Sequence, residues 1–172
     1  MNGKVIGGFL VLSGVIAGAA MYYLQVYAFY DDVSDATTTV ELTTVAGGAP
    51  ETILADNIDA IDADSSPLRF RACFETPMSQ AMLTETYALY DGPVPLNAPG
   101  WFDCFDADAI GAALESGTAL AFLGTENIVY GIDRVVAITD TGRGYVWHQI
   151  NACGEEVFDG RPAPEGCPEP SQ

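Results

Sequence analysis

The only histidine in the 172-residue sequence is the first candidate for catalytic chemistry. His148 lies in the run Tyr145-Val146-Trp147-His148-Gln149-Ile150. Histidine acts as a general base or metal ligand near neutral pH, but no nucleophile motif such as G-x-S-x-G accompanies it here. Zinc sites usually need closely spaced ligand pairs, and the sequence has no CxxC pair. We therefore interpret His148 as a strand residue that is hydrogen-bonded at a sheet face or packed beside Trp147.

Carboxylates are abundant, with 24 Asp and Glu residues, so a chance pair at the spacing of a glycosidase acid and base is expected. The stretch from Asp56 to Asp64 is a candidate for calcium. It fails the EF-hand pattern because Pro67 stands where the loop needs glycine. We interpret it as scattered, solvated carboxylates. No phosphate-binding or dinucleotide-binding glycine motif is present, so the sequence predicts no catalytic residue, no metal site and no cofactor.

Few cations are available to pair with these carboxylates. Lysine and arginine together number six, which gives a net charge of −18, and Lys4 is the only lysine. Arg69, Arg71, Arg134 and Arg143 are therefore unusual positions. The simpler interpretation is buried or half-buried ion pairing that orders the fold. The sharper one is contact with an anionic group or carboxylate of a partner.

Trp101 is a further candidate for partner contact. With Phe102 it stands beside Cys104 and Phe105, and such an aromatic group forms either a corner of the core or an exposed docking patch. We favour the core.

Four cysteines indicate disulfides, because the count is even and the domain is expected outside the cytoplasm. They are Cys73, Cys104, Cys153 and Cys167. Four cysteines allow three pairings, and the sequence does not choose among them. We favour Cys73 with Cys104 and Cys153 with Cys167, since the second pair would tie a Pro-rich tail over residues 159–172. Closing a loop of that length contributes about 3 kcal/mol in the chain-entropy model.

The N-terminal segment predicts a membrane anchor over residues 1–30. No charged side chain occurs from Val5 to Tyr30, and a helix of this length spans about 39 Å against a hydrocarbon core of about 30 Å. Tyrosines at its C-terminal end fit an interfacial aromatic belt. Lys4 before the segment and Asp31 after it place the N-terminus in the cytoplasm by the positive-inside rule. A cleaved signal peptide is the alternative, with Ala17-Gly18-Ala19 as the cleavage site, but the apolar run continues beyond it.

One face of this segment carries small residues. Gly14 and Gly18 form a GxxxG pair, and Gly7 falls on the same helical face. Small residues let two helices approach closely in a bilayer. Gly7, Gly14 and Gly18 are thus candidate contacts for a partner helix, although small residues are also common in single spans.

The remaining chain predicts an α+β fold, in which one transmembrane helix precedes a small antiparallel-sheet domain with one or two packed helices. Residues 31–38 form a polar linker and residues 39–158 the domain. Asp106 to Ser116 is the best helix, with Asp106 as its N-cap and Gly117 at its end. Asp140-Thr141-Gly142-Arg143-Gly144 is the clearest hairpin turn. Strands are expected over residues 39–45, 68–74, 84–90, 118–123, 128–139 and 145–150.

Several motifs resemble an uncharacterised family of small single-pass membrane proteins from alphaproteobacteria. They are Met21-Tyr22-Tyr23-Leu24-Gln25-Val26-Tyr27, Ser65-Ser66-Pro67-Leu68-Arg69-Phe70-Arg71-Ala72-Cys73-Phe74, Trp101-Phe102-Asp103-Cys104-Phe105-Asp106-Ala107 and Gly131-Ile132-Asp133-Arg134-Val135. The resemblance covers most of the chain. It implies a bacterial inner membrane and a periplasmic domain, and it supplies no activity.

The charge narrows the function further. A net charge of −18 opposes binding to nucleic acid and to anionic lipid, and it favours a cationic partner. The leading hypothesis is a membrane-anchored, acidic periplasmic accessory, assembly or interaction protein without catalytic activity, which contacts a membrane or periplasmic protein. The alternative is a periplasmic enzyme or small-ligand-binding domain that uses carboxylates, arginines and His148. A purely structural tethered domain is a third option.

Overall fold

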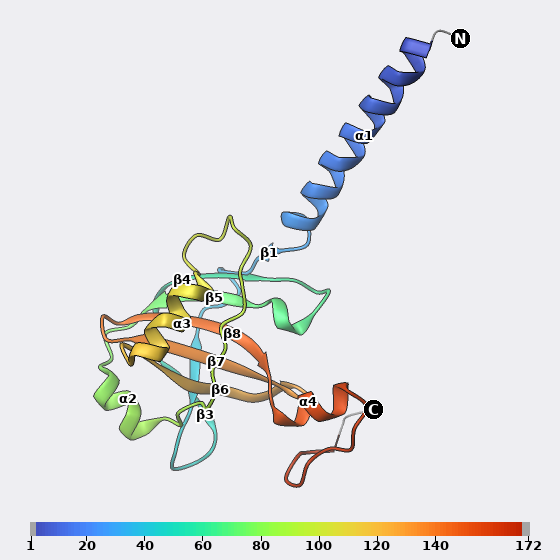
Figure 1. Ribbon diagram of the computed structural model, residues 1–172. Coiled ribbons are helices and arrows are strands. Elements are labelled where there is room, and N and C mark those ends of the chain that lie inside the picture. The colour runs from blue at the N-terminus through green and yellow to red at the C-terminus, as the bar shows by residue number, and fades with distance from the viewer. Residues whose placement is uncertain (1–2, 170–172) are drawn as a thin grey trace. The chain divides into compact units, whose positions relative to one another are not determined.

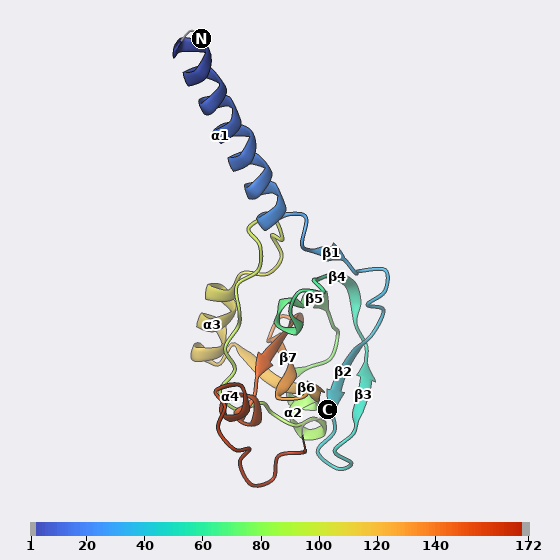
Figure 2. The same cartoon turned by 90° about the vertical axis from the view of Figure 1, so that its right-hand side faces the viewer.

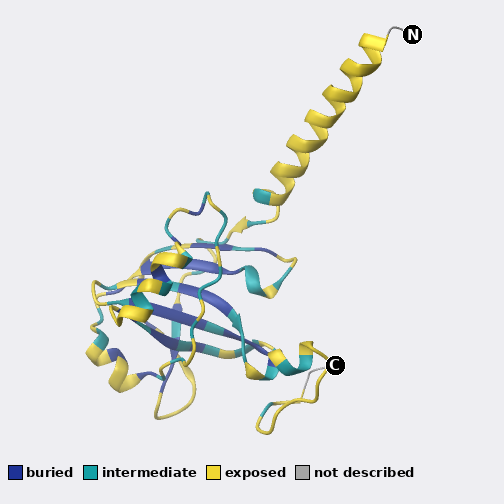
Figure 3. Ribbon diagram, in the orientation of Figure 1, coloured by how far each residue is buried: buried dark blue, intermediate teal, exposed yellow. Residues whose placement is uncertain are grey.

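The computed structural model describes residues 3–169, which form two compact units divided between Asp31 and Asp32. The first unit is dominated by one helix, α1 (Gly3–Val26), of 24 residues. None of its residues is buried (Figure 3). The helix is long and apolar enough to cross a membrane. Exposed apolar side chains in such a run are costly in water, and the length of the helix matches the thickness of a bilayer core.

The second unit is built on a six-stranded antiparallel sheet in the order β1-β4-β5-β8-β7-β6, with a separate β2–β3 hairpin (Figure 1). The sheet strands are β1 (Asp31–Asp32), β4 (Asp56–Asp62), β5 (Arg71–Glu75), β6 (Ala119–Val129), β7 (Ile132–Thr139) and β8 (Arg143–Ile150). The hairpin consists of β2 (Val40–Thr43) and β3 (Pro50–Ile53). The helices are α2 (Gln80–Thr86), α3 (Ala107–Ser116) and α4 (Ala152–Phe158), with a 3-10 turn at Pro67–Arg69. The α+β class is thereby confirmed.

One face of the sheet forms the main core with the β2–β3 hairpin. Residues in register across four strands present apolar side chains to this face. They are Ala72, Phe74, Val146, Val136, Ile138 and Phe122, and all are buried. Gly144 makes room for the Phe74 ring, because a Cβ at this glycine would lie 2.1 Å from Phe74 Cζ. From the hairpin, Leu42 packs into this core, and Thr43 Oγ1 donates to the carbonyl of Gly124 at 2.9 Å.

The opposite face is covered by α3 and by the irregular segment before it, residues 91–106, which we name the crossing segment (Figure 2). Trp147, which is 0% exposed, lies at the centre of this face. The ring of Phe105 packs edge-on against Trp147 and Tyr145, with centroids 6.4 and 5.9 Å apart. The sheet is thus buried on both faces, and the crossing segment forms part of the core.

Helix α3 confirms the strongest local prediction. The Asp106 side chain accepts from the amides of Asp108 and Ala109, and Gly117 ends the helix in the left-handed conformation with φ 75°. Capping satisfies amides that lack a partner in the first turn, and glycine adopts positive φ without a steric penalty.

Three strand predictions need correction. Residues 84–90 do not form one strand: Thr84 to Thr86 end α2, whose N-cap is Ser79, and only Tyr87 and Leu89 make isolated bridges. Residues 128–139 are not continuous, because Gly131 with φ 76° turns the chain between β6 and β7. Leu68 and Arg69 belong to the 3-10 turn, so β5 begins only at Arg71. Capping and turn residues outweighed the apolar pattern in each case.

Strands β1, β3 and β4 and helix α4 were not predicted. Strand β4 coincides with the acidic stretch, whose carboxylates mask the buried Ala60 and Ile61. Helix α4 begins at the N-cap Asn151, whose side chain accepts from the amide of Gly154. The range expected to be a linker also contains β1, and Val33 there packs against the main core.

Candidate functional site

His148 on β8 is enclosed rather than presented to solvent. It is 5% exposed, and its ring stacks on Phe70 with centroids 4.9 Å apart. Its Nδ1 lies 2.6 Å from the carbonyl oxygen of Pro67, and its Nε2 lies 3.1 Å from Nε of Arg134. Because Arg134 Nε can only donate, we assign the neutral tautomer in which Nδ1–H donates to Pro67. Both ring nitrogens are therefore occupied, as expected for a structural histidine.

The pKa of His148 is lowered to about 4, chiefly by burial and further by the positive charges of Arg134 and Arg71. An unfolded histidine titrates near pH 6.5, so the unfolded chain binds this proton first as the pH falls. We expect the His148 contribution to stability to be complete above pH 6.5 and to be lost as the pH falls toward 4. Between pH 6.5 and about pH 5 the loss is about 1.5 kcal/mol. Urea unfolding of wild type and of His148→Gln at both pH values measures it. An equal pH dependence in the two proteins would contradict this assignment.

Arg134 on β7 is held by an aromatic ring and by histidine. Its guanidinium carbon lies 4.6 Å from the centre of the Phe70 ring, within range of a cation–π contact. Burial lowers the pKa of Arg134, and the charges of Glu41 and Asp62 oppose that shift. Within residues 3–169 no carboxylate lies within ion-pair distance of Arg134, so the ion pairing expected at this position is wrong. The sequence could not show that His148 and Phe70 would supply its contacts.

Arg71 on β5 connects the sheet to the crossing segment. It is 4% exposed, and its guanidinium donates to four carbonyl oxygens. Two belong to the crossing segment, namely those of Leu96 at 2.8 Å and Asn97 at 3.2 Å. Five fixed donors let one arginine satisfy several backbone acceptors at once. Arg69, by contrast, lies half-buried at the end of the 3-10 turn.

Two other side chains on the same face of the sheet hold the crossing segment. Gln149 accepts from the amide of Val94 at 2.7 Å and donates to the carbonyl of Gly92 at 3.0 Å. Cys73 is bonded to Cys104, and Cys153 to Cys167, which are the two pairs that we favoured above. Gln149 was not singled out in the sequence, because only the strand register reveals that it shares a face with Arg71 and Cys73.

Trp101 lies in the crossing segment and is half-buried, with its ring edge-on to Phe102 at 6.3 Å. Phe102 and Phe105 are both buried. This aromatic group thus contributes to the core on the Trp147 face, and Trp101 forms its outer margin.

A buried carboxylate that we did not single out in the sequence lies at the N-terminal end of β7. Asp133 is 6% exposed and accepts from the Asn127 amide at 2.9 Å, from Asn151 Nδ2 at 2.7 Å and from Tyr90 Oη at 3.3 Å. Burial, aided by the negative charge of Asp133, raises the pKa of Tyr90 well above its usual value. Asp133 thus organises the β6–β7 turn and the start of α4, and its oxygens are occupied by donors of the chain.

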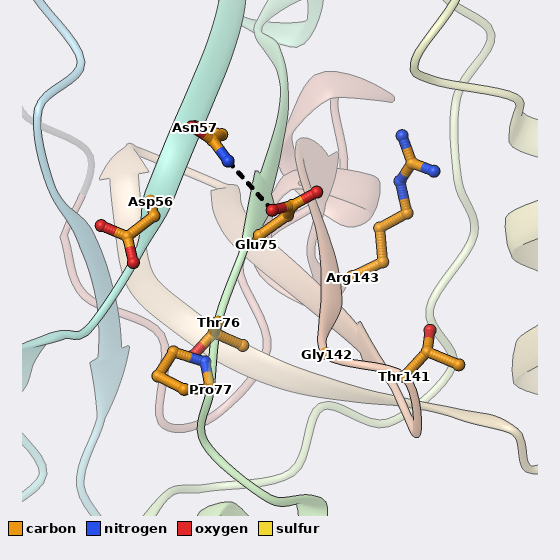
Figure 4. Close-up of a pocket in the computed structure, with 8 residues that line it drawn as sticks. All are labelled: Asp56, Asn57, Glu75, Thr76, Pro77, Thr141, Gly142 and Arg143. Atoms are coloured by element: carbon orange, nitrogen blue, oxygen red, sulfur yellow. Dashed lines mark hydrogen bonds between the residues drawn. The ribbon is translucent and has the colours of Figure 1, made fainter.

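A cleft of about 590 Å³ lies open to solvent at one end of β4, β5 and β8 (Figure 4). Its charged side chains are Asp56, Glu75 and Arg143, one from each of three neighbouring strands. The rest of the lining consists of Asn57, Thr76, Pro77, Thr141 and Gly142. Volumes of 300 to 1,000 Å³ are typical of small-molecule sites. Within residues 3–169 no group of three His, Cys, Asp or Glu residues is arranged to hold a metal ion.

The sequence itself relates this chain to other proteins. A family model described as a family of unknown function (DUF6446) matches residues 40–168, three quarters of the chain. The chain belongs to this family. No curated protein and no solved structure matches it.

The match to DUF6446 divides the candidate residues into two sets. Most of the candidate residues lie inside the matched range: the residues that line the cleft, the four cysteines, Arg69, Arg71, Trp101, Arg134 and His148. Gly7, Gly14 and Gly18 on α1 lie outside it. The family is therefore defined by the sheet domain, and its description supplies no activity.

Proposed function

We propose that this member of DUF6446 is a bacterial inner-membrane protein with a single span, a cytoplasmic N-terminus and an acidic periplasmic domain that binds a partner protein. The observation that carries the proposal is α1, a 24-residue helix that is mainly apolar and none of whose residues is buried, directly before a domain with two disulfides. A helix of this length spans the hydrocarbon core, and disulfides persist in oxidising compartments such as the periplasm. Lys4 at the N-terminal end of α1 supports the orientation.

The charge distribution supports binding to a partner. All 24 Asp and Glu residues follow α1, against five arginines in the same part of the chain. Arg161 forms ion pairs with Glu156 of α4 and with Asp159, while Arg71 and Arg134 are buried or half-buried in the sheet. The outer surface therefore keeps its negative charge, which steers a cationic partner by long-range attraction.

The glycine face of α1 supports a partner within the membrane. A Cβ built at Gly7, Gly14 or Gly18 meets no atom within 4 Å outside the helix's own backbone. Close approach along such a face favours helix association through van der Waals contact. We expect Gly14→Leu with Gly18→Leu to reduce recovery of the partner severalfold while membrane insertion is unchanged. Leu12→Ile is the control. Equal recovery of the partner with the glycine variant and with Leu12→Ile would show that the glycine face does not contact the partner.

The absence of lysine from the domain makes a direct test available. A carbodiimide joins carboxylates to amines without a spacer. Lys4 and the N-terminus are the chain's only amines, and both lie across the bilayer from the domain in this topology. A crosslink formed by the domain in native membranes must therefore take its amine from another molecule. We expect one or a few defined adducts of higher mass, identified by mass spectrometry. Recovery of the monomer alone at native abundance would contradict the proposal.

A further inference from the structure

The cleft contains three charged side chains in one cross-strand row. Asp56 pairs with Glu75 in the β4–β5 register, and Glu75 pairs with Arg143 in the β5–β8 register. Residues directly opposite each other share a face of the sheet, and opposite charges there usually attract. The row thus consists of two carboxylates followed by a guanidinium, one on each of three neighbouring strands. All three side chains are exposed.

The charges in this row do not neutralise one another. Glu75 accepts a hydrogen bond from Asn57 Nδ2 at 2.9 Å, whereas within residues 3–169 no ion pair joins it to Arg143. Figure 4 shows the Arg143 side chain extending away from Glu75, with the Asn57 amide on the opposite side of the carboxylate. Asn57 reaches this position because the β4–β5 register is interrupted after Asp56 and its own φ is 53°.

The position of Asp56 opposite Glu75 has a further consequence. Like charges directly opposite each other destabilise a sheet pair, and among the described residues that line the cleft the only cationic side chain, Arg143, comes from the strand on the other side of Glu75. The formal charges of Asp56, Glu75 and Arg143 sum to −1 around an open cleft. Their complement is a molecule with two positive groups and one negative group. Adjacent strands lie about 4.8 Å apart, so the row spans about 10 Å, which suits an extended molecule the size of lysine.

We propose that this cleft binds a free basic α-amino acid. Arg143 takes the carboxylate in a bidentate contact, which its planar guanidinium favours. Glu75 takes the α-ammonium, and Asp56 takes the side-chain cation. The proposal goes beyond partner binding and does not depend on it, because the cleft and the α1 glycines lie on separate units of the chain.

Three probes separate this ligand from simple attraction to an acidic surface. L-lysine carries all three groups, cadaverine lacks the carboxylate, and L-norleucine lacks the side-chain ammonium. We expect calorimetric titration of the full chain in a non-ionic detergent to show saturable 1:1 binding of L-lysine. Each missing group should weaken binding about tenfold or more, the usual effect of losing a charge-assisted hydrogen bond. Absence of saturable L-lysine binding, or equal binding of cadaverine, would overturn the proposal.

Variants assign the contacts. Arg143→Gln should weaken L-lysine binding about tenfold and leave cadaverine binding unchanged or tighter, since it removes a cation. Asp56→Asn should weaken both. Glu115→Gln on α3 is the matched control, because it removes one exposed carboxylate outside the cleft and should leave L-lysine binding within about twofold. Equal weakening by Asp56→Asn and Glu115→Gln would show a general charge effect and overturn the assignment. Thermal melts of each variant verify folding.

Discussion

Replacing Trp147 with alanine is expected to lower the free energy of unfolding by about 3 to 5 kcal/mol, the usual cost of truncating a buried aromatic side chain. Trp147 is fully buried between β5, β7 and the crossing segment, and Phe105 packs edge-on against it. Its removal leaves a cavity that neighbours in a sheet cannot easily fill. Urea unfolding followed by far-UV circular dichroism measures the loss.

Trp101 provides a matched control for this prediction. The same substitution there removes a half-buried ring at the margin of the same aromatic group. We expect Trp101→Ala to lower the free energy of unfolding by about 1 to 2 kcal/mol, because the half-buried Trp101 ring has less apolar area buried from water than the Trp147 ring. If Trp101→Ala proved as costly as Trp147→Ala, the proposed centre of the core on this face would be wrong.

Replacing Cys73 and Cys104 together with alanine is expected to cost about 3.5 to 4 kcal/mol. The two cysteines are separated by 31 positions, and the chain-entropy model gives this value for a loop of that size. The bond joins β5 to the crossing segment, where Arg71 and Gln149 supply the other attachments. We therefore expect the crossing segment to become sensitive to protease, with cleavage sites mapped by mass spectrometry within residues 91–106.

The second disulfide is the control for the first. Cys153 and Cys167 are separated by 14 positions and enclose the Pro-rich tail, so their removal should release the tail and leave the crossing segment protected. In the chain-entropy model this bond contributes about 3 kcal/mol. Protection of residues 91–106 without the Cys73–Cys104 bond would mean that Arg71 and Gln149 suffice to hold them.

Features with a local sequence signal could be predicted. The apolar run gives α1, the Asp106 cap and Gly117 give α3, and the glycine-rich turn at 140–144 gives the β7–β8 hairpin. Each signal lies within a few residues of the element that it defines.

Features set by distant parts of the chain were missed or misjudged. Strand β4 is apolar only at Ile58, Ala60 and Ile61, and its other four residues are Asp or Asn, so its composition resembles that of a loop. Arg71 and Arg134 were recognised as unusual, but carbonyl oxygens and His148, which no spacing rule predicts, are among their partners. The cleft depends on the register of three strands, two of which are 68 positions apart at Glu75 and Arg143. Sequence patterns report local conformation, whereas sites of this kind are assembled by tertiary pairing.

Fractionation of cells that express the full chain, combined with labelling of free thiols, tests the central claim most directly. If α1 anchors an exported domain, the protein stays in the membrane pellet after alkaline carbonate extraction, protease removes the domain only once the outer membrane is opened, and a maleimide reagent adds no mass until the protein is reduced. Recovery of the intact chain in the cytosol with four reactive thiols would contradict the account.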